Sequence, residues 1–480
     1  MHKQKILPVV AMIACLHGNG AVAADPVVQS LQTKSEILHL IRREKLDVVL
    51  PGAMRDNEVD MWINVIRSGD PDPMQLHFGP VWGYVIFSDP GEGRVERAIF
   101  GSGGHPDLFD HFGSDEISRA IEGYDYGLVD DDVYDELRQY VAARDPETIA
   151  INTSDWLAIA DGLSHSQYLK LESVLGDEYA RRFVSAEHLI TDFRSRRAQS
   201  EIVEFAKALA THRQLLIRAL SREVITPGVT TPENVGRWVV EESQRLGVSY
   251  GVDSYIPMPR ILYSAVSDTS EPPDVRWRIY DPRQVIQRGD FMTYDISVRH
   301  LEYFTTDYKR NAYVFREGED SIPASIQRAF DRAIQAHDIM RPHIRAGRTA
   351  RQTLDALVVA LEAEGYLYTP FIDIGAEDYI IIQNALADTD VPGFSIDLHA
   401  MGNNGGSLVT VGASVAPFRK DRFDLMLQEN TFFSFEYMVH SHLAERPGLP
   451  VSINIEGNHL ITARGVEYLH PRNERILEIR

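Results

Sequence analysis

The sequence has almost no cysteine and a shortage of positive charge. The only cysteine among its 480 residues is Cys15, so a chain that loses its first two dozen residues can form no disulfide. Lysine and arginine number 48 against 70 aspartates and glutamates, which gives a formal net charge of −22. An acidic chain without a basic patch repels phosphate backbones, so we expect no nucleic-acid partner. No later apolar run approaches ~18 residues, so we expect no membrane span in the mature protein.

The N-terminus has the pattern of a secretory signal peptide. Lys3 and Lys5 precede the apolar stretch 6–16, and small residues follow at Ala21-Val22-Ala23. We therefore expect residues 1–24 to be a cleaved signal peptide and the protein to be secreted or periplasmic. A lipid anchor on Cys15 is the less favoured alternative, because the apolar run continues past this residue.

The length predicts two to four domains. Residues 25–195 alternate between short apolar runs and helical patterns, which favours a mixed α/β domain. The segment Asp89-Pro90-Gly91-Glu92-Gly93 separates two apolar runs and predicts a β-hairpin. The other expected elements are helices at 35–45 and 58–66 and short strands at 47–50 and 148–152.

The second half of the sequence contains two similar segments. A helix pair around Pro227-Gly228 ends at Gly247, and a similar pair around Ala346-Gly347 ends at Gly365. Each pair is followed by strand-like segments. The pattern indicates a duplicated fold, although two unrelated amphipathic hairpins would look alike.

Five residues with ligand-type side chains lie in otherwise apolar, strand-like segments: Asp295, Asp307, His399, Glu436 and Glu456. Taken singly, each has a structural explanation, such as a salt bridge or a satisfied core histidine. A buried carboxylate is costly unless it is paired or metal-bound, and four on converging strands exceed what arginine pairing can satisfy. Four carboxylates and one imidazole suit two divalent ions that share bridging oxygens, roughly 3.5–4 Å apart.

These residues make the sequence resemble the M24 metallopeptidase family, the pita-bread fold of aminopeptidase P, prolidase and creatinase. The segment 198–202 followed by Thr226-Pro227-Gly228-Val229-Thr230 is similar to the family's entry into its catalytic half. The resemblance implies an α+β fold. An N-terminal creatinase-like α/β domain (25–195) would precede a C-terminal pseudo-two-fold pita-bread catalytic domain (196–480). A homodimer is a possible state in this family.

The resemblance also implies roles for the five residues. Asp295 would bind one ion, and His399 with Glu436 the other. Asp307 and Glu456 would bridge the two ions. The 12-residue spacing of the aspartates would place them beside each other across a hairpin. Manganese is the preferred metal, with cobalt, zinc or iron as alternatives.

The family's substrate-binding residues are largely missing. Histidines expected at Gly406 and Ser395 are absent, and an arginine expected before the last glutamate is Asn454. We expect Glu436 to carry the proton, with His440 and His442 in a following loop as candidate replacements for the lost donors.

The leading hypothesis is a secreted dinuclear metallohydrolase of the Xaa-Pro aminopeptidase/prolidase type. It would cleave small peptides or peptide-like amides by a metal-bridging hydroxide. The first alternative is a non-peptidase enzyme of the same fold, a C–N hydrolase or lyase acting on a small molecule. The second is a non-catalytic binding protein.

Overall fold

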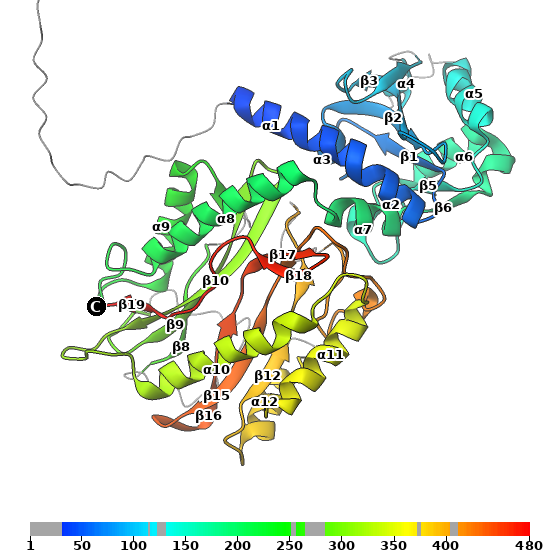
Figure 1. Ribbon diagram of the computed structural model, residues 1–480. Coiled ribbons are helices and arrows are strands. Elements are labelled where there is room, and N and C mark those ends of the chain that lie inside the picture. Colours follow the sequence, from blue (N-terminus) through cyan, green and yellow to red (C-terminus); the bar gives the residue numbers. More distant parts are fainter. Residues whose placement is uncertain are drawn as a thin grey trace, which may run out of the picture.

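A computed structural model describes residues 31–113, 116–121, 131–250, 256–264, 284–371, 376–403 and 411–480. The expected signal peptide, residues 1–24, lies outside this range. Figure 1 shows two domains, a smaller N-terminal one and a larger C-terminal one. None of the described helices is long and apolar enough to cross a membrane.

A mixed six-stranded sheet, in the order β4-β3-β2-β1-β5-β6, forms the centre of the N-terminal domain. The strands are β1 (Met61–Ile66), β2 (Val81–Ser88), β3 (Glu96–Gly103), β4 (Asp110–Phe112), β5 (Ile149–Ile151) and β6 (Phe183–Ser185). The surrounding helices are α1 (Leu31–Glu44), a π-helical turn (Lys45–Val49), α2 (Leu50–Asp56), α3 (Gln75–Phe78), α4 (Glu116–Ile121), α5 (Asp135–Arg144), α6 (His165–Ala180) and α7 (Glu187–Ser195). Each face of the sheet carries its own apolar core: α2 and α7 cover one face, and α4, α5 and α6 cover the other.

The structure confirms part of the expected element order in this domain. The hairpin is β2 paired antiparallel with β3, and the strand expected at 148–152 is β5. The strand expected at 47–50 is wrong, because this segment is helical, and the helix expected at 58–66 is wrong, because Met61–Ile66 is the strand β1. Every residue of β1 is buried between β2 and β5. A short run that is apolar on both faces has no periodicity to separate strand from helix.

The C-terminal domain places two helix pairs over curved sheets (Figure 1). The first pair is α8 (Gln199–Ala219) and α9 (Pro232–Arg245), and the second is α10 (Ala324–Met340) and α11 (Ala350–Ala363). Thr231 and Thr349 cap α9 and α11 in the same way, each by a capping box. The expected repetition of two helix pairs is therefore confirmed. A further helix, α12 (Ala376–Leu386), contacts the strand Arg446–Ile455.

Three sheets carry the strands of this domain. The first contains β7 (Ser249–Tyr250), β8 (Arg260–Tyr263), β9 (Phe291–His300), β10 (Phe304–Val314) and β19 (Leu477–Ile479). The second contains β11 (Leu367–Tyr368), β12 (Gly393–Ile396), β15 (Tyr437–Leu443) and β16 (Arg446–Ile455). The third contains β13 (His399–Ala400), β14 (Thr431–Ser434), β17 (Asn458–Thr462) and β18 (Gly465–Tyr468). One apolar core joins α8 and α9 to the first sheet, and another joins α10 and α11 to the other two.

A buried charged cluster, the junction cluster, connects the two domains where α7 ends and α8 begins. Its centre is Glu201, whose carboxylate lies 3.1 Å from Lys45 Nζ and 3.2 Å from an Arg197 guanidinium nitrogen. The same carboxylate accepts a hydrogen bond from the backbone N–H of Ala198 at 2.8 Å and one from the Tyr303 hydroxyl at 3.3 Å. Burial lowers the pKa of Lys45 to about 7 despite its attraction to Glu201.

Candidate metal centre

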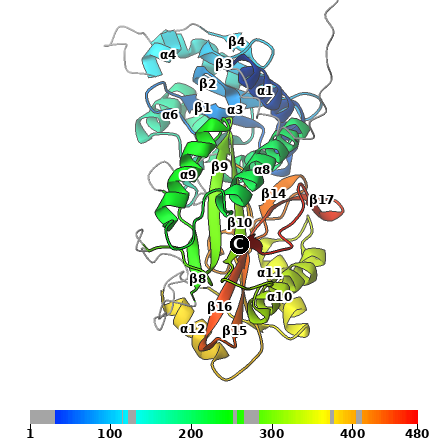
Figure 2. The same cartoon turned by 90° about the vertical axis from the view of Figure 1, so that its left-hand side faces the viewer.

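Strands from all three sheets of the C-terminal domain, and the segments that join them, bring the five expected ligand residues together. Asp295 and Asp307 lie on the β9–β10 hairpin, and His399 opens β13. Glu436 stands between β14 and β15, and Glu456 between β16 and β17. Figure 2 shows the long strands β9, β10 and β16 below the N-terminal domain. Strands β10 and β16, which belong to different sheets, contact each other.

The register of the β9–β10 hairpin decides what faces Asp295. A tight turn at Leu301 and Glu302, both with positive φ, pairs His300 with Phe304. This register places Lys309 directly opposite Asp295, and Asp307 opposite Ser297. The two aspartates therefore lie diagonally on one face of the hairpin, and not side by side as the spacing suggested.

Lys309 was not expected in the site, yet its ammonium group lies among the carboxylates. Its Nζ is 3.2 Å from Asp295 Oδ2 and 3.0 Å from Glu456 Oε2, and it donates a short hydrogen bond to Glu436 Oε1. The side chain is buried. Burial alone would lower the pKa of Lys309, but the surrounding carboxylates outweigh it and raise the pKa well above its ordinary value.

The carboxylates repel one another in this buried site. Burial, together with the charges of Glu456 and Asp295, raises the pKa of Asp307 well above its ordinary value. Burial also raises the pKa of Glu456 to about 8, although Lys309 partly opposes the shift. Lys309 alone therefore does not balance the negative charge of the cluster.

His399 presents one ring nitrogen to the carboxylates. Its Nδ1 donates a hydrogen bond to the carbonyl oxygen of Ala400 at 3.1 Å, so Nε2 is the ring nitrogen that faces the carboxylates. This Nε2 stands 3.5 Å from Glu436 Oε2. At this distance the nitrogen and the oxygen need either a ring proton or a metal ion between them, because two lone pairs would repel. The arrangement therefore fits a bound cation.

Two sets of donors have the proximity that a metal ion needs. Ligand atoms of Asp307, His399 and Glu456 all lie within 4.8 Å of one another, and so do those of Asp397, His399 and Glu436. All of these residues are buried. An imidazole with carboxylate oxygens suits Mn²⁺, Fe²⁺, Co²⁺ or Zn²⁺. Among the described residues, Asp295 belongs to no such set.

Neighbouring polar groups hold the donors in place. Ser434 donates a 2.5 Å hydrogen bond to Glu456 Oε1, and the backbone N–H of Asp307 donates to the Asn458 side chain at 2.9 Å. Asp397 donates its backbone N–H to the Glu436 carbonyl at 3.0 Å, and its carboxylate lies 3.1 Å from Arg419. Such supporting bonds fix the orientation of potential ligands.

His440 and His442 lie on strand β15, so the expectation that they stand in a loop was wrong. The ring nitrogens of His440 lie 2.9 Å from Ser395 Oγ and 2.8 Å from Ser452 Oγ. Burial lowers the pKa of His440 to about 3. Four residues of strand separate it from Glu436, or roughly 13 Å along the chain. The structure therefore does not bring His440 to the carboxylates.

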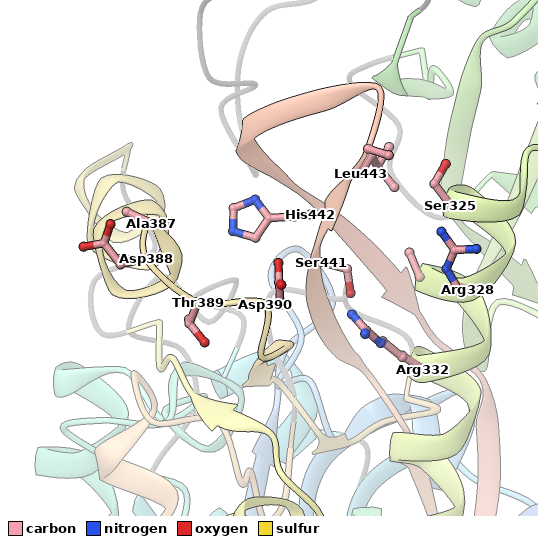
Figure 3. A pocket seen from close by; sticks show the side chains of 12 residues that line it. Ser325, Arg328, Arg332, Ala387, Asp388, Thr389, Asp390, Ser441, His442 and Leu443 are labelled. Carbon is pink, nitrogen blue, oxygen red and sulfur yellow. The ribbon is translucent and has the colours of Figure 1, made fainter.

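His442 belongs to a different cavity. It lines a pocket of about 590 Å³, together with Arg328 and Arg332 of α10 and with Asp388 and Asp390 beyond α12 (Figure 3). Its Nε2 donates a 2.9 Å hydrogen bond to the carbonyl of Leu386. Catalytic roles for His440 and His442 stay predictions that these positions do not favour.

Comparison with known proteins decides the family. The sequence profile of metallopeptidase family M24 matches residues 204–463, more than half of the chain. The chain belongs to metallopeptidase family M24. Comparison with curated proteins gives no match.

Solved structures show the same fold for this M24 protein. An X-Pro aminopeptidase from Thermotoga maritima is similar with a TM-score of 0.55 at 16% identity, covering 89% of this chain and 100% of the other. An Xaa-Pro dipeptidase from Bacillus anthracis is similar with a TM-score of 0.53 at 16% identity, covering 91% and 100%. These findings confirm the α+β fold class, with an N-terminal α/β domain before a pita-bread domain.

Membership in M24 confirms the expectation of a metallohydrolase and agrees with the donor sets around His399. Of the positions where the substrate-binding pattern departs, Gly406 lies outside the described residues. Ser395 Oγ donates a hydrogen bond to the Thr369 carbonyl and lies 2.9 Å from His440 Nε2, so its hydroxyl is held by groups other than the carboxylates of the site. Neither Lys309 nor Asp397, the aspartate of the second donor set, was singled out from the sequence.

Proposed function

We propose that this M24 protein is a metal-dependent hydrolase of amide bonds in small peptides, with Xaa-Pro peptides as the leading substrate class. The observation that supports the proposal is the buried donor set around His399, whose Nε2 faces Glu436 Oε2 at 3.5 Å. The substrate class is carried over from the fold relatives, an X-Pro aminopeptidase and an Xaa-Pro dipeptidase.

Asp307, His399 and Glu456 would hold the ion, with Glu436 at its edge. A divalent ion at such a site supplies Lewis-acid polarisation of an amide carbonyl and acidifies a water molecule. Glu436 would accept a proton at Oε2 and return it to the leaving amine, while Lys309 holds Oε1 in position. The proposed mechanism does not include the expected two-ion arrangement with its bridging hydroxide, because the ammonium group of Lys309 adjoins Asp295.

The first test is hydrolysis of a panel of Xaa-Pro dipeptides and tripeptides with added Mn²⁺. Glu436→Gln should lower the rate about 10²- to 10⁴-fold, the usual contribution of a general acid-base group, without loss of the fold. The exposed Glu429→Gln in the same domain is the matched control and should keep the wild-type rate. Full activity of Glu436→Gln would remove this residue from the mechanism.

A second candidate is a C–N hydrolase or lyase that acts on a small molecule of another kind. It is favoured by the position of Ser395, where the family resemblance implies a substrate-binding histidine, because this side chain is committed to protein groups. Metal-dependent turnover of non-peptide amides by a protein that leaves every Xaa-Pro peptide intact would select this candidate.

We also propose, independently of the activity, that the protein is secreted. The charged start and apolar stretch of residues 1–24 support it. Expression of the full chain followed by cell fractionation and N-terminal sequencing tests it. A protein that stays inside the cell with its N-terminus intact would contradict secretion without affecting the hydrolase proposal.

A further inference from the structure

A cation that belongs to the chain itself occupies one side of the carboxylate cluster. The Nζ of Lys309 reaches one oxygen from each of Asp295, Glu436 and Glu456. The three carboxylates come from three different segments, so the lysine connects the hairpin to both other sheets. An ammonium group in such a position has the same neighbours that a metal ion would have.

The donors divide into two sides. On one side, Asp295 has two basic partners, Lys309 at 3.2 Å and Arg260 at 3.8 Å. On the other side, His399 stands with Asp307 and Glu456 in a set whose ligand atoms lie within 4.8 Å of one another. Glu456 contacts Lys309 as well and therefore lies between the two sides. The chain therefore supplies positive charge beside Asp295, and a cation from outside is needed only beside His399.

We propose that Lys309 takes the place of one of two ions, so that the centre holds a single divalent ion beside a fixed ammonium group. The inference rests on the proposed function, because it concerns the ion that this function needs. It differs from the two-ion arrangement that the family resemblance implies.

Charge arithmetic supports one ion. The four carboxylates carry four negative charges when all are ionised. Lys309 offsets one, Arg260 beside Asp295 offsets another and a divalent ion offsets two, so a single ion balances the four carboxylates. A second divalent ion would make the buried site net positive and would have to share the oxygens of Asp295, Glu436 and Glu456 with the ammonium group.

The test is the number of Mn²⁺ ions bound per chain, measured by equilibrium dialysis and elemental analysis. Wild type should bind one ion tightly. Lys309→Met, which keeps the length but removes the charge, should bind two, and Lys309→Arg should bind one. The exposed Lys420→Met is the matched control and should bind one.

A second possible metal site has to be removed from the count. The half-buried His39 and the exposed His105 and Asp107 have ligand atoms within 4.8 Å of one another in the N-terminal domain. All proteins should therefore carry His105→Ala, so that any second ion belongs to the cluster around Lys309.

Electron paramagnetic resonance supplies a readout independent of activity. An isolated Mn²⁺ ion in wild type should show the hyperfine pattern of a single centre. Two neighbouring ions in Lys309→Met should show the broadened spectrum of a coupled pair. If Lys309→Met does not fold, the count and spectrum of the wild type still decide the matter.

Two coupled ions in the wild type would overturn the role of Lys309 and leave the metal-dependent hydrolase intact. A single ion in folded Lys309→Met would also overturn it. Binding of no Mn²⁺ by wild type would instead reject the proposed function itself, and the inference with it.

Discussion

Two buried lysines, one at the domain junction and one in the metal centre, have opposite surroundings. At the junction, Lys45 shares a single carboxylate, Glu201, with Arg197. In the centre, Lys309 alone adjoins three carboxylates. Burial lowers the pKa of Lys45 to about 7, whereas the carboxylates raise the pKa of Lys309 against the effect of burial. The junction is rich in cations and the centre is rich in anions.

The difference shows which of the two clusters needs a cation from outside the chain. At the junction, the lowered pKa of Lys45 lets this residue lose its proton near neutral pH, which leaves Arg197 to pair with Glu201 without a partner from outside the chain. Negative groups in excess around one ammonium leave charge that an external cation offsets. The same substitution should therefore have opposite consequences in the two places.

The largest expected effect is the loss of chemistry in the centre. His399→Ala removes the one nitrogen donor of the site, so hydrolysis should fall by about 10³-fold, since Lewis-acid stabilisation is worth several kcal/mol. Bound Mn²⁺ should fall below one per chain. Peptide hydrolysis and elemental analysis measure the two effects, and His343→Ala, outside both donor sets, is the control. Retention of full activity would separate the chemistry from this site.

The next effect is loss of stability at the junction. Glu201→Gln removes the charge that Lys45 and Arg197 share, and should lower the free energy of unfolding by about 3–5 kcal/mol. Urea denaturation measures it. The exposed pair of Glu233 with Arg237 provides the control, because Glu233→Gln should cost under about 1 kcal/mol. An equally small effect at both positions would show that the junction cluster does not stabilise the fold.

The matching substitution in the centre should have the opposite sign. The folded-state pKa of Glu456 is raised to about 8, so this group contributes most stability at low pH and loses it as the pH rises from about 4.5 to 8. In chelator-treated protein at pH 7, Glu456→Gln should therefore raise the free energy of unfolding by about 3 kcal/mol. Saturating Mn²⁺ should reverse the order, because the variant lacks a ligand. If Glu456→Gln lowered the free energy of unfolding of the metal-free protein, an excess of negative charge in the centre would be contradicted.

The smallest effect is a pH dependence at the junction. Because the folded-state pKa of Lys45 is lowered, the unfolded chain binds a proton that the folded chain lacks between about pH 7 and the ordinary value of 10.5. Stability should therefore increase with pH, by about 2 kcal/mol from pH 7 to pH 8.5. Lys45→Met should flatten this part of the profile in urea denaturation. A wild-type profile as flat as that of the variant would show that Lys45 stays protonated.

The sequence sufficed for the features that have a strong local signal. The glycine-rich turn at 89–93 predicted the β2–β3 hairpin, and the repeated stop signals predicted both helix pairs. The strand β1 was missed because a run that is apolar on both faces carries no helical or strand period. Its identity depends on the neighbours β2 and β5, which are distant in the sequence.

The sequence predicted the donor residues of the candidate site, but it did not predict the positive charge of Lys309 beside them. Resemblance and strand context selected Asp295 and the other four residues, and the structure brings all five together; their role as ligands stays a prediction. Lys309 had a usable signal, because a residue two positions after Asp307 on a strand shares its face. The hairpin register, which depends on the turn at Leu301, was needed to place it opposite Asp295.

The position of Lys309 among the carboxylates affects how the protein responds to metal depletion. A bound ion can be taken away by a competing chelator, but an ammonium group on the β10 backbone travels with the chain. Metal depletion should therefore inactivate this protein without unfolding it, and activity should return when the ion is supplied again.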